Sequence, residues 1–518
     1  MRKHIQSRNV KYGAISLTLT ALVVTAVIVF NVVLSLLATR YEWLYISLAP
    51  QNSFTISEEC EDYLQNYVID VADAHNAQQS SESKKLVITF CEESDVITQE
   101  DWKKYVHDSA LQIQKLFPNH IEINYLNIWE NPSLAREMGV TSTSSLVCSF
   151  GDRHEAMDMR DFYIYDNANS SNVIAYNGEK IISALLMRAV QDTSPICYFT
   201  ANHGEAFDGY EFMRTVVESG YNIGFLDLAN DAIPDDCELL ITFDPKQDLV
   251  AADGISSDSE VEKLEAYMSS GGKYMVFLSA DSFVSGGRAN LEGFLADWGI
   301  QYAHETGNDG IEKCYLIKDP SNSLSVDGYT ILAENVSYGK GGEIMSTMPS
   351  GNVFANSTCI NFAEGFNKTE SGSFAATVNG KTRTASPLIV SYASAEAWAG
   401  GRAVQRAGDN PFVLMAISEQ ECDNGETACL VASASTAFAS DTHMKSAVVG
   451  NNRTVMGIFK YMGRENAPDS LTFKYFASTD IESLTTKNAN MLTITLALIP
   501  AVICITVGVV VLVRRRYS

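Results

Sequence analysis

Four polar residues, Asn202-His203-Gly204-Glu205, directly follow the apolar, strand-like run PICYFTA. Such a segment is expected at the carboxyl edge of a parallel sheet, where open α/β sheets usually bind their ligands. Two acidic residues follow apolar runs in the same way, one after LLITF and one after MVFLSA. The sequence therefore predicts a polar crevice for a small ligand or a peptide. Its candidate residues are Asn202, His203, Gly204, Glu205, Asp244 and Asp281.

Two interpretations of this segment stay open. In one, His203 and Glu205 belong to the active site of a hydrolase or an amidotransferase-like enzyme. In the other, both side chains cap the helix that follows, and Gly204 supplies a tight turn. We favour capping, because no nucleophile, oxyanion loop or second histidine stands near this segment in the sequence. We therefore predict no catalytic residue.

The sequence also lacks the motifs of several enzyme classes. It contains no GxSxG, HExxH or GxGxxG. Gly271-Gly272-Lys273 resembles a phosphate loop, but Tyr267 stands where that loop needs its first glycine and Tyr274 where it needs Ser or Thr. We expect a helix end there, and predict neither a metal nor a cofactor.

Ten cysteines occur, and no two of them form a CxxC pair, so neither a redox dithiol nor a zinc ribbon is predicted. Cys422 and Cys429 flank the polar loop DNGETA and are the one pair whose closeness suggests a disulfide. Spacing alone does not establish that bridge.

The polar edge needs a sheet to position it, and the central region supplies the pattern of one. From PICYFTA to GKYMVFLSA, apolar runs of strand length alternate with helical runs such as GYEFMRTVVESG and DSEVEKLEAYMSSG. This alternation predicts a mostly parallel sheet with helices on both faces. Residues 302–380 are rich in Gly, Ser, Asn and Thr, and we expect an irregular insertion there.

A smaller unit is predicted before this sheet. The strand-like run KLVITFCE is followed by a helical pattern, the strand-like run HIEINYLNIW, a short helix and a hairpin-like pair. This order is typical of a thioredoxin-like fold, although the redox dithiol is absent, so only the scaffold is expected to be shared. A capped helix is also predicted to begin near Ser57.

Two uncharged apolar runs, 12–38 and 488–513, are long enough to cross a hydrocarbon layer of about 30 Å. Basic residues crowd the outer end of each run, which predicts cytoplasmic termini and an extracytoplasmic region between the runs. Residues 12–513 carry 30 basic against 63 acidic side chains, which argues against nucleic acid as a partner. The expected location is the plasma membrane, with the lipid bilayer as a partner.

The predicted fold class is thus α/β, with two transmembrane helices flanking an extracytoplasmic region that holds a thioredoxin-like unit and a larger, mostly parallel sheet domain. The predicted divisions are 1–11 (cytoplasmic tail), 12–38 (first span), 39–83 (juxtamembrane segment and linker), 84–177 (thioredoxin-like unit), 178–465 (sheet domain with the insertion), 466–487 (linker), 488–513 (second span) and 514–518 (cytoplasmic tail).

Several short segments follow one another in a fixed order along the chain: Phe54-Thr55-Ile56-Ser57, Asn202-His203-Gly204-Glu205, Asp227-Leu228, Ile233-Pro234, Gly271-Gly272-Lys273, Asn290-Leu291, Trp298-Gly299-Ile300, Gly450-Asn451 and Arg514-Arg515-Arg516. This order of features resembles the GldG-like auxiliary components of ABC-type transport systems, a family named for a gliding-motility protein. The resemblance extends over nearly the whole chain. Asn202 and Asp244 depart from the pattern, because the family usually has glycine at both positions, and residues 302–380 have no clear counterpart.

The resemblance implies a non-catalytic accessory or extracytoplasmic-binding subunit that works with a separate ATPase and a multi-span permease. This chain has no Walker loop of its own, so it is not expected to be the motor. Two alternatives from other classes stay open. One is an extracytoplasmic enzyme acting at His203 and Glu205, and the other is a scaffold that binds envelope proteins.

Overall fold

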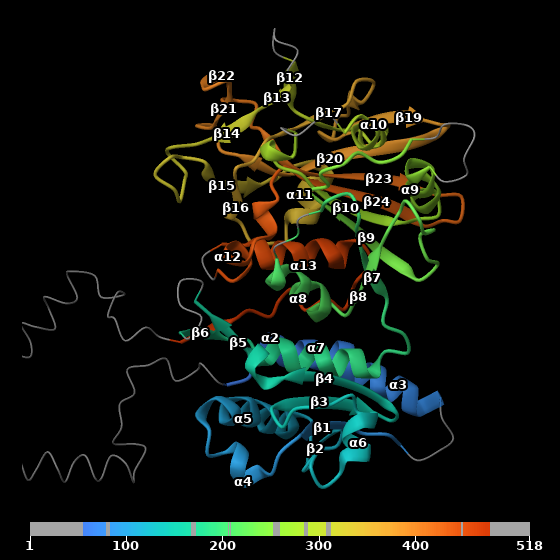
Figure 1. Ribbon diagram of the computed structural model, residues 1–518, viewed down its shortest axis with the longest axis vertical. Coiled ribbons are helices and arrows are strands. Elements are labelled where there is room, and N and C mark those ends of the chain that lie inside the picture. The colour runs from blue at the N-terminus through green and yellow to red at the C-terminus, as the bar shows by residue number, and fades with distance from the viewer. Residues whose placement is uncertain are drawn as a thin grey trace, which may run out of the picture. The chain divides into compact units, whose positions relative to one another are not determined.

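The computed structural model describes residues 55–78, 83–166, 172–205, 207, 209–251, 259–283, 288–306, 312–446 and 449–476. All described residues belong to one compact unit, Phe54–Phe476, which contains two principal sheets (Figure 1).

The predicted transmembrane helices at 12–38 and 488–513 lie outside the described residues. Within the part of the chain that the structure describes, no helix combines the length and apolar character that crossing a membrane requires. The predicted fold class, with two flanking transmembrane helices, is therefore corrected to a mixed α/β structure.

The smaller sheet has four strands in the order β2-β1-β3-β4. β1 and β2 run parallel, whereas β3 runs antiparallel to β1 and forms a hairpin with β4. The elements follow the predicted sequence of strand, helix, strand, short helix and hairpin; the term thioredoxin-like stays an interpretation of that order. The bounds are β1 (Leu86–Phe90), α4 (Ser94–Ile97), α5 (Asp101–Leu116), β2 (Ile121–Tyr125), α6 (Pro132–Glu137), β3 (Ser145–Phe150) and β4 (Arg153–Asp158).

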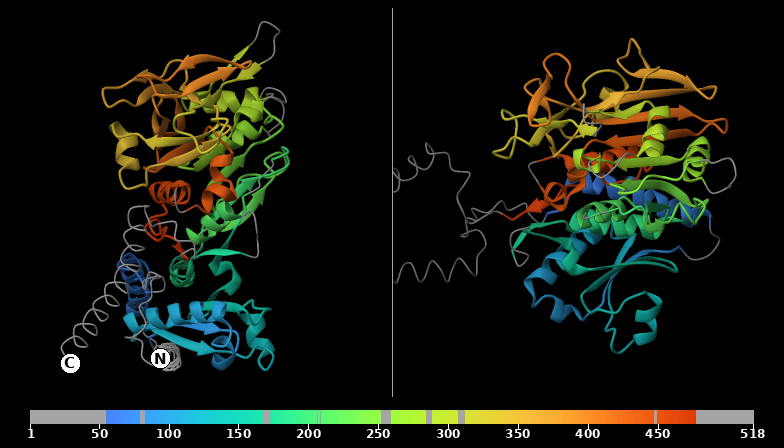
Figure 2. Two further views of the ribbon diagram at one scale, coloured as in Figure 1. Left: turned by 90° about the vertical axis from the view of Figure 1, so that its left-hand side faces the viewer. Right: turned by 45° about the horizontal axis from the view of Figure 1, so that its top comes forward.

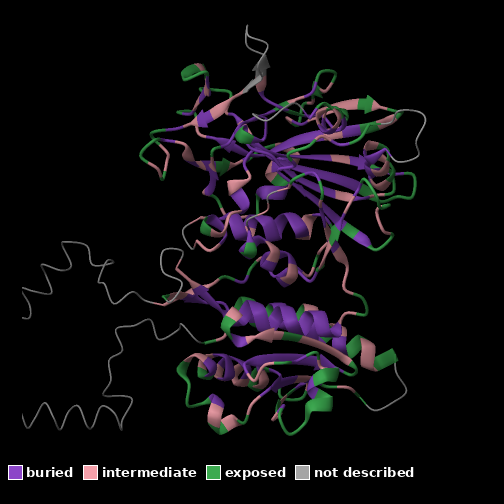
Figure 3. Cartoon of the chain, in the orientation of Figure 1, coloured by how far each residue is buried: buried purple, intermediate pink, exposed green. Residues whose placement is uncertain are grey.

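Two helical segments pack around this sheet. The first begins where the sequence predicted, since Ser57 Oγ accepts a hydrogen bond from the N–H of Cys60 at 3.3 Å. The second, α7 (Gly178–Val190), is buried at every position (Figure 3). Buried residues of both segments and of the sheet form one hydrophobic cluster. The first segment consists of α2 (Glu58–Leu64), the π-helix η2 (Gln65–Ile69) and α3 (Asp70–Gln78).

A small three-stranded sheet, in the order β25-β6-β5, joins the end of the described chain to the segment before α7. β25 (Lys474–Tyr475) is the last strand and pairs antiparallel with β6, which directly precedes α7. The other elements here are η3 (Met159–Phe162), β5 (Tyr163–Tyr165) and β6 (Val173–Tyr176).

The larger sheet has 13 strands, and its main path runs β16-β15-β20-β23-β24-β10-β9-β7-β8. Neighbouring strands from β8 to β24 pair in parallel, but those from β24 to β16 pair antiparallel. The predicted mostly parallel sheet is therefore corrected to a mixed one, because the hairpin of β23 and β24 reverses the chain. The strands of the path are β7 (Ile196–Thr200), β8 (Asn222–Leu226), β9 (Cys237–Phe243), β10 (Lys273–Phe277), β15 (Thr330–Asn335), β16 (Asn352–Ala355), β20 (Lys381–Ser391), β23 (Val413–Glu421) and β24 (Thr427–Ser433).

Helices cover both faces of the parallel half (Figure 2). Met275 and Phe277 of β10 belong to the same hydrophobic cluster as residues of α8 and α13. Tyr274 and Val276, which point the other way, cluster with residues of α9 and α10. The helices are α8 (Tyr210–Glu218), α9 (Glu260–Ser269), α10 (Ala289–Asp297) and α13 (Asn451–Tyr461).

The predicted irregular region 302–380 holds short strands and one helix, several of which extend the large sheet. The remaining elements are η4 (Ala280–Phe283), β11 (Ile300–Tyr302), β12 (His304–Thr306), β13 (Glu312–Cys314), β14 (Leu316–Lys318), α11 (Gly339–Met345), β17 (Ile360–Phe362), β18 (Asn367–Lys368), β19 (Phe374–Val378), β21 (Glu396–Ala399), β22 (Arg402–Arg406), η5 (Ala437–Ala439) and α12 (Asp441–Met444).

Candidate functional site

The candidate strand edge lies where β7, β9 and β10 end, and hydrogen bonds tie its loops together. The carbonyl oxygen of His203 accepts the backbone N–H groups of Lys246 at 2.7 Å and Gln247 at 2.9 Å. Ser282 Oγ donates to Asp244 Oδ1 at 2.6 Å, which joins the loop after β9 to the turn after β10. The parallel pairing of the three strands is what brings these loops to one edge.

Three backbone positions of this edge are left-handed. φ is +75° at Asn202, +73° at Gly204 and +47° at Asp244. Glycine adopts such angles freely, and Asn and Asp tolerate them better than other residues do. Asn202 and Asp244 are also the two positions at which the sequence departs from the glycines of the family it resembles. The departures are therefore compatible with an unchanged backbone turn.

His203 is enclosed between two carboxylates. Its side chain is buried, and Nε2 lies 3.0 Å from an oxygen of Glu260, the first residue of α9. Nδ1 lies 3.5 Å from Glu205 Oε1, while the other oxygen of Glu205 accepts the backbone N–H of His203 at 2.7 Å. Glu260 is fully buried and also accepts the N–H of Val250 at 2.6 Å. The three side chains thus form a compact charged cluster.

These contacts fix the charge of the imidazole. The adjacent carboxylate of Glu205 raises the pKa of His203 to about 9, against the opposing effect of burial and with the help of Glu260. Burial acts to raise the pKa of Glu205, but the nearby imidazole of His203 and hydrogen bonds from backbone N–H groups outweigh that effect and leave the pKa lowered. His203 is therefore protonated at neutral pH and is in the wrong state to act as a general base.

The prediction that His203 and Glu205 cap the helix that follows them, α8, is wrong. The N-cap of α8 is Gly209, and the backbone N–H of Glu211 in its first turn donates to Asp441 Oδ1 at 2.9 Å rather than to His203 or Glu205. Instead, His203 contacts Glu260 at the start of α9, 57 residues further along the chain. Sequence reasoning missed Glu260. The available signal was its place directly after Ser259, whose Oγ caps α9 by accepting the backbone N–H of Glu262.

The other candidate residues differ in their surroundings. Asn202 Nδ2 donates to the carboxylate of Asp227. Asp244 is buried and contacts Lys246 Nζ as well as Ser282. Asp281 lies on η4 and is exposed to solvent. Most polar groups of this edge are therefore used in contacts within the protein.

The cysteines and acidic residues show no metal centre in the part that the structure describes: no group of three or more His, Cys, Asp or Glu side chains is placed to hold a metal ion. Cys422 and Cys429 are free thiols, so the disulfide considered from the sequence is not formed in this structure. Cys422 Sγ instead lies 3.5 Å from the carbonyl oxygen of Met268.

Sequence reasoning also missed Lys180, which is buried on α7. The available signal was a single lysine in the first turn of the largely apolar helix GEKIISALLMRAVQ. A helix that is apolar on all sides is expected to be buried, and its lysine with it.

A sequence model of the family described as ABC-type uncharacterized transport system, which comprises auxiliary components, matches residues 194–457. The chain belongs to this family. The matched range runs from just before β7 into α13, so the family region includes the strand edge and the first part of α13. The finer GldG-like assignment is not part of that match.

A comparison with curated proteins found no match to this chain. Among solved structures, the mmIFT52 N-terminal domain is 15% identical with a TM-score of 0.35, and the alignment covers 52% of this chain and 96% of that one. A ThuA-like protein from Bacteroides uniformis is 9% identical with a TM-score of 0.29, covering 52% and 93%. PurLQS from Thermotoga maritima is 10% identical with a TM-score of 0.25, covering 52% and 100%.

Proposed function

We propose that this protein is a non-catalytic accessory subunit of an ABC transport system, working with a separate ATPase and a multi-span permease. Its family supports a role in such a system, and the sequence contains no Walker loop with which to hydrolyse a nucleotide. The large sheet then serves as a surface for the partner subunits or for a transported ligand. In this proposal the protein acts at the membrane, on the extracytoplasmic side.

The enclosure of His203 is the observation that supports a non-catalytic role for this subunit. A histidine held between Glu205 and Glu260 keeps its proton at neutral pH and has no nucleophile among its described contacts. Acid or base catalysis needs a group that exchanges its proton near the working pH and reaches the substrate. The cluster instead supports a rigid polar edge on which partners bind.

Affinity purification of the tagged full-length chain in mild detergent, at native expression, tests the proposal. We expect an ABC ATPase and a permease to be recovered together with the chain. Recovery of the chain alone in repeated experiments would contradict the proposal. Recovery of envelope proteins without an ATPase and a permease would instead favour the scaffold alternative.

A variant separates the accessory role from the enzyme alternative. His203→Gln removes the charge of the imidazole but keeps a hydrogen-bonding side chain. If the protein is an accessory subunit, the folded variant still recovers the ATPase and the permease and still supports transport. If transport were lost while the complex and the fold stayed intact, the result would favour the enzyme alternative, in which His203 is catalytic.

A further inference from the structure

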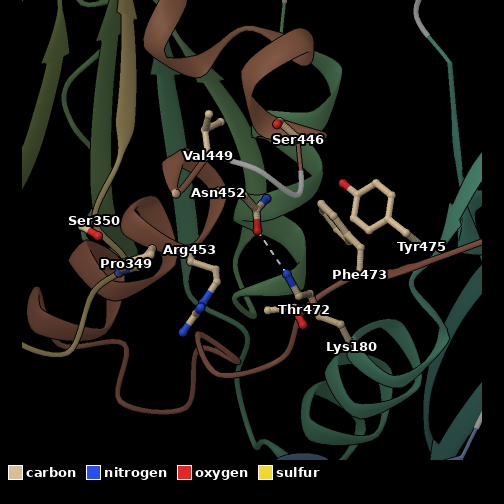
Figure 4. Close-up of a pocket in the computed structure, with 11 residues that line it drawn as sticks. Lys180, Pro349, Ser350, Ser446, Val449, Asn452, Arg453, Thr472, Phe473 and Tyr475 are labelled. Carbon is tan, nitrogen blue, oxygen red and sulfur yellow. Dashed lines mark hydrogen bonds between the residues drawn. The ribbon is translucent and has the colours of Figure 1, made fainter. Parts of the chain in front are cut away.

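A cavity of about 230 Å³ lies where α7 meets the first turn of α13 (Figure 4). Four segments form its walls: α7, the loop before β16, the start of α13 and the chain that leads into β25. Its polar and aromatic lining consists mainly of Lys180, Ser446, Asn452, Arg453, Phe473 and Tyr475.

The Lys180 ammonium group is buried at this cavity. The residue is 1% exposed, and Nζ donates a hydrogen bond to Asn452 Oδ1 at 3.1 Å. Nζ also lies 4.9 Å from the centroid of the Phe473 ring, which Figure 4 shows beside it. Among the described residues, no carboxylate lies within 4.0 Å of this nitrogen.

Two other buried cations, Lys103 and Arg188, are arranged differently. Lys103 Nζ lies 2.6 Å from Glu92, and Arg188 lies 2.9 Å from Glu155. Lysine is almost never fully buried unless it is paired, because removing its charge from water is costly. Burial lowers the pKa of Lys180 to about 8, the direction expected of an ammonium group without a close counter-ion. Lys180 thus lacks the close carboxylate that Lys103 and Arg188 have.

The rest of the lining is positive or neutral as well. The Nε–H of Arg453 donates to the backbone carbonyl oxygen of Asp469 at 3.3 Å, and this acceptor is not a carboxylate. Gly450, the N-cap of α13, provides no side-chain cap, and helix N-termini carry partial positive charge. None of the described residues that line the cavity is acidic. The cavity therefore favours a negatively charged ligand.

Its size restricts that ligand to a compact molecule. A cavity of about 150 Å³ is enough to hold benzene. The larger space here accommodates one ring or a short apolar group together with a carboxylate or phosphate. Phe473 and Tyr475 offer an aromatic wall against which such a group can pack.

We propose that this cavity binds a compact organic anion. Its carboxylate or phosphate lies between Lys180 and the first turn of α13, and its flat apolar part packs against Phe473 and Tyr475. This site is separate from the His203 edge and does not depend on the proposed role in transport. Because its walls come from both α7 and α13, the bound anion joins the helix of the smaller sheet to a helix of the larger one.

Isothermal titration calorimetry of the purified full-length chain tests the proposal with four probes: benzoate, phenyl phosphate, inorganic phosphate and benzyl alcohol. We expect benzoate or phenyl phosphate to bind at least about tenfold more tightly than the uncharged alcohol and inorganic phosphate. Equal affinity for benzyl alcohol would overturn the anionic part. Equal affinity for inorganic phosphate would overturn the organic part and leave a site for free phosphate.

Variants locate the binding within the chain. Lys180→Met should weaken the binding of the preferred probe by at least about tenfold, whereas Lys104→Met, at an exposed position of α5, should leave it unchanged. Circular dichroism checks the fold of each variant. If Lys180→Met does not fold, Arg453→Gln provides the same test at a half-buried position. Unchanged affinity in the folded variant, or no binding of either aromatic anion, overturns the proposal.

Discussion

Nε2 of His203 lies 3.0 Å from a carboxylate oxygen of Glu260, which ties the turn after β7 to the first residue of α9. Glu205 contacts the other ring nitrogen at 3.5 Å. A charged imidazole between two carboxylates is a buried network in which each charge depends on its neighbours. We therefore expect this network to stabilise the sheet edge rather than to catalyse a reaction.

The first prediction concerns Glu260. Glu260→Gln should lower the free energy of unfolding by about 2 kcal/mol, because it removes one partner of a buried charge cluster. The expected loss is below the usual cost of breaking a buried ion pair, since Glu205 still faces His203. Urea denaturation at pH 7 measures it. Glu262→Gln, at an exposed position of the same helix, is the control and should change stability by less than about 0.5 kcal/mol.

The second prediction is a pH dependence. The pKa of His203 is raised to about 9 in the folded protein, above its ordinary value of 6.5. Its stabilising contribution is therefore complete below about pH 6.5 and is lost as the pH rises through about 9. Urea denaturation at pH 6, 7.5 and 9.5 should show this loss, and His203→Gln should remove it. The same decline in both proteins would contradict the assignment.

The sequence predicted the local elements of this edge well, and the reason is periodicity. β10 alternates Tyr274 and Val276 on one face with Met275 and Phe277 on the other, so a short, fully buried strand could be expected. The turn after β7 was visible in its polar residues. These features depend on neighbours in the sequence, which pattern reasoning can follow.

Long-range partners could not be predicted in the same way. Glu260 meets His203 only because a crossover brings α9 to the end of β7, and nothing in the residues around Glu260 specifies that contact. Lys180 could be placed on a helix, but its missing counter-ion depends on how α7 packs against Asn452 of α13. The antiparallel half of the sheet was missed because alternating strands and helices described only residues 196–277.

The third prediction concerns the left-handed turn. At φ = +75°, Asn202→Val should destabilise the protein by about 2 kcal/mol, because a β-branched residue is strained in this conformation. Asn202→Gly relieves the backbone but loses the hydrogen bond to Asp227, so its stability should stay within about 1 kcal/mol of the wild type. Thermal unfolding of both variants measures the difference. Equal loss in the two would show that the side chain, and not the backbone, sets the stability of the turn.

The fourth prediction compares two buried lysines in the absence of ligand. Lys103 is paired with Glu92 and Glu100, whose carboxylates reach solvent, so Lys103→Met removes both ion pairs and should cost about 1 kcal/mol of unfolding free energy. Lys180 has no close carboxylate among the described residues, so Lys180→Met removes an uncompensated charge and fills its space with an apolar chain of similar length. Its stability should equal or exceed that of the wild type. Urea denaturation of the two variants in ligand-free buffer measures both changes. A loss at Lys180 as large as that at Lys103 would mean that the chain itself supplies the counter-charge, and the cavity would then have no need of an anion.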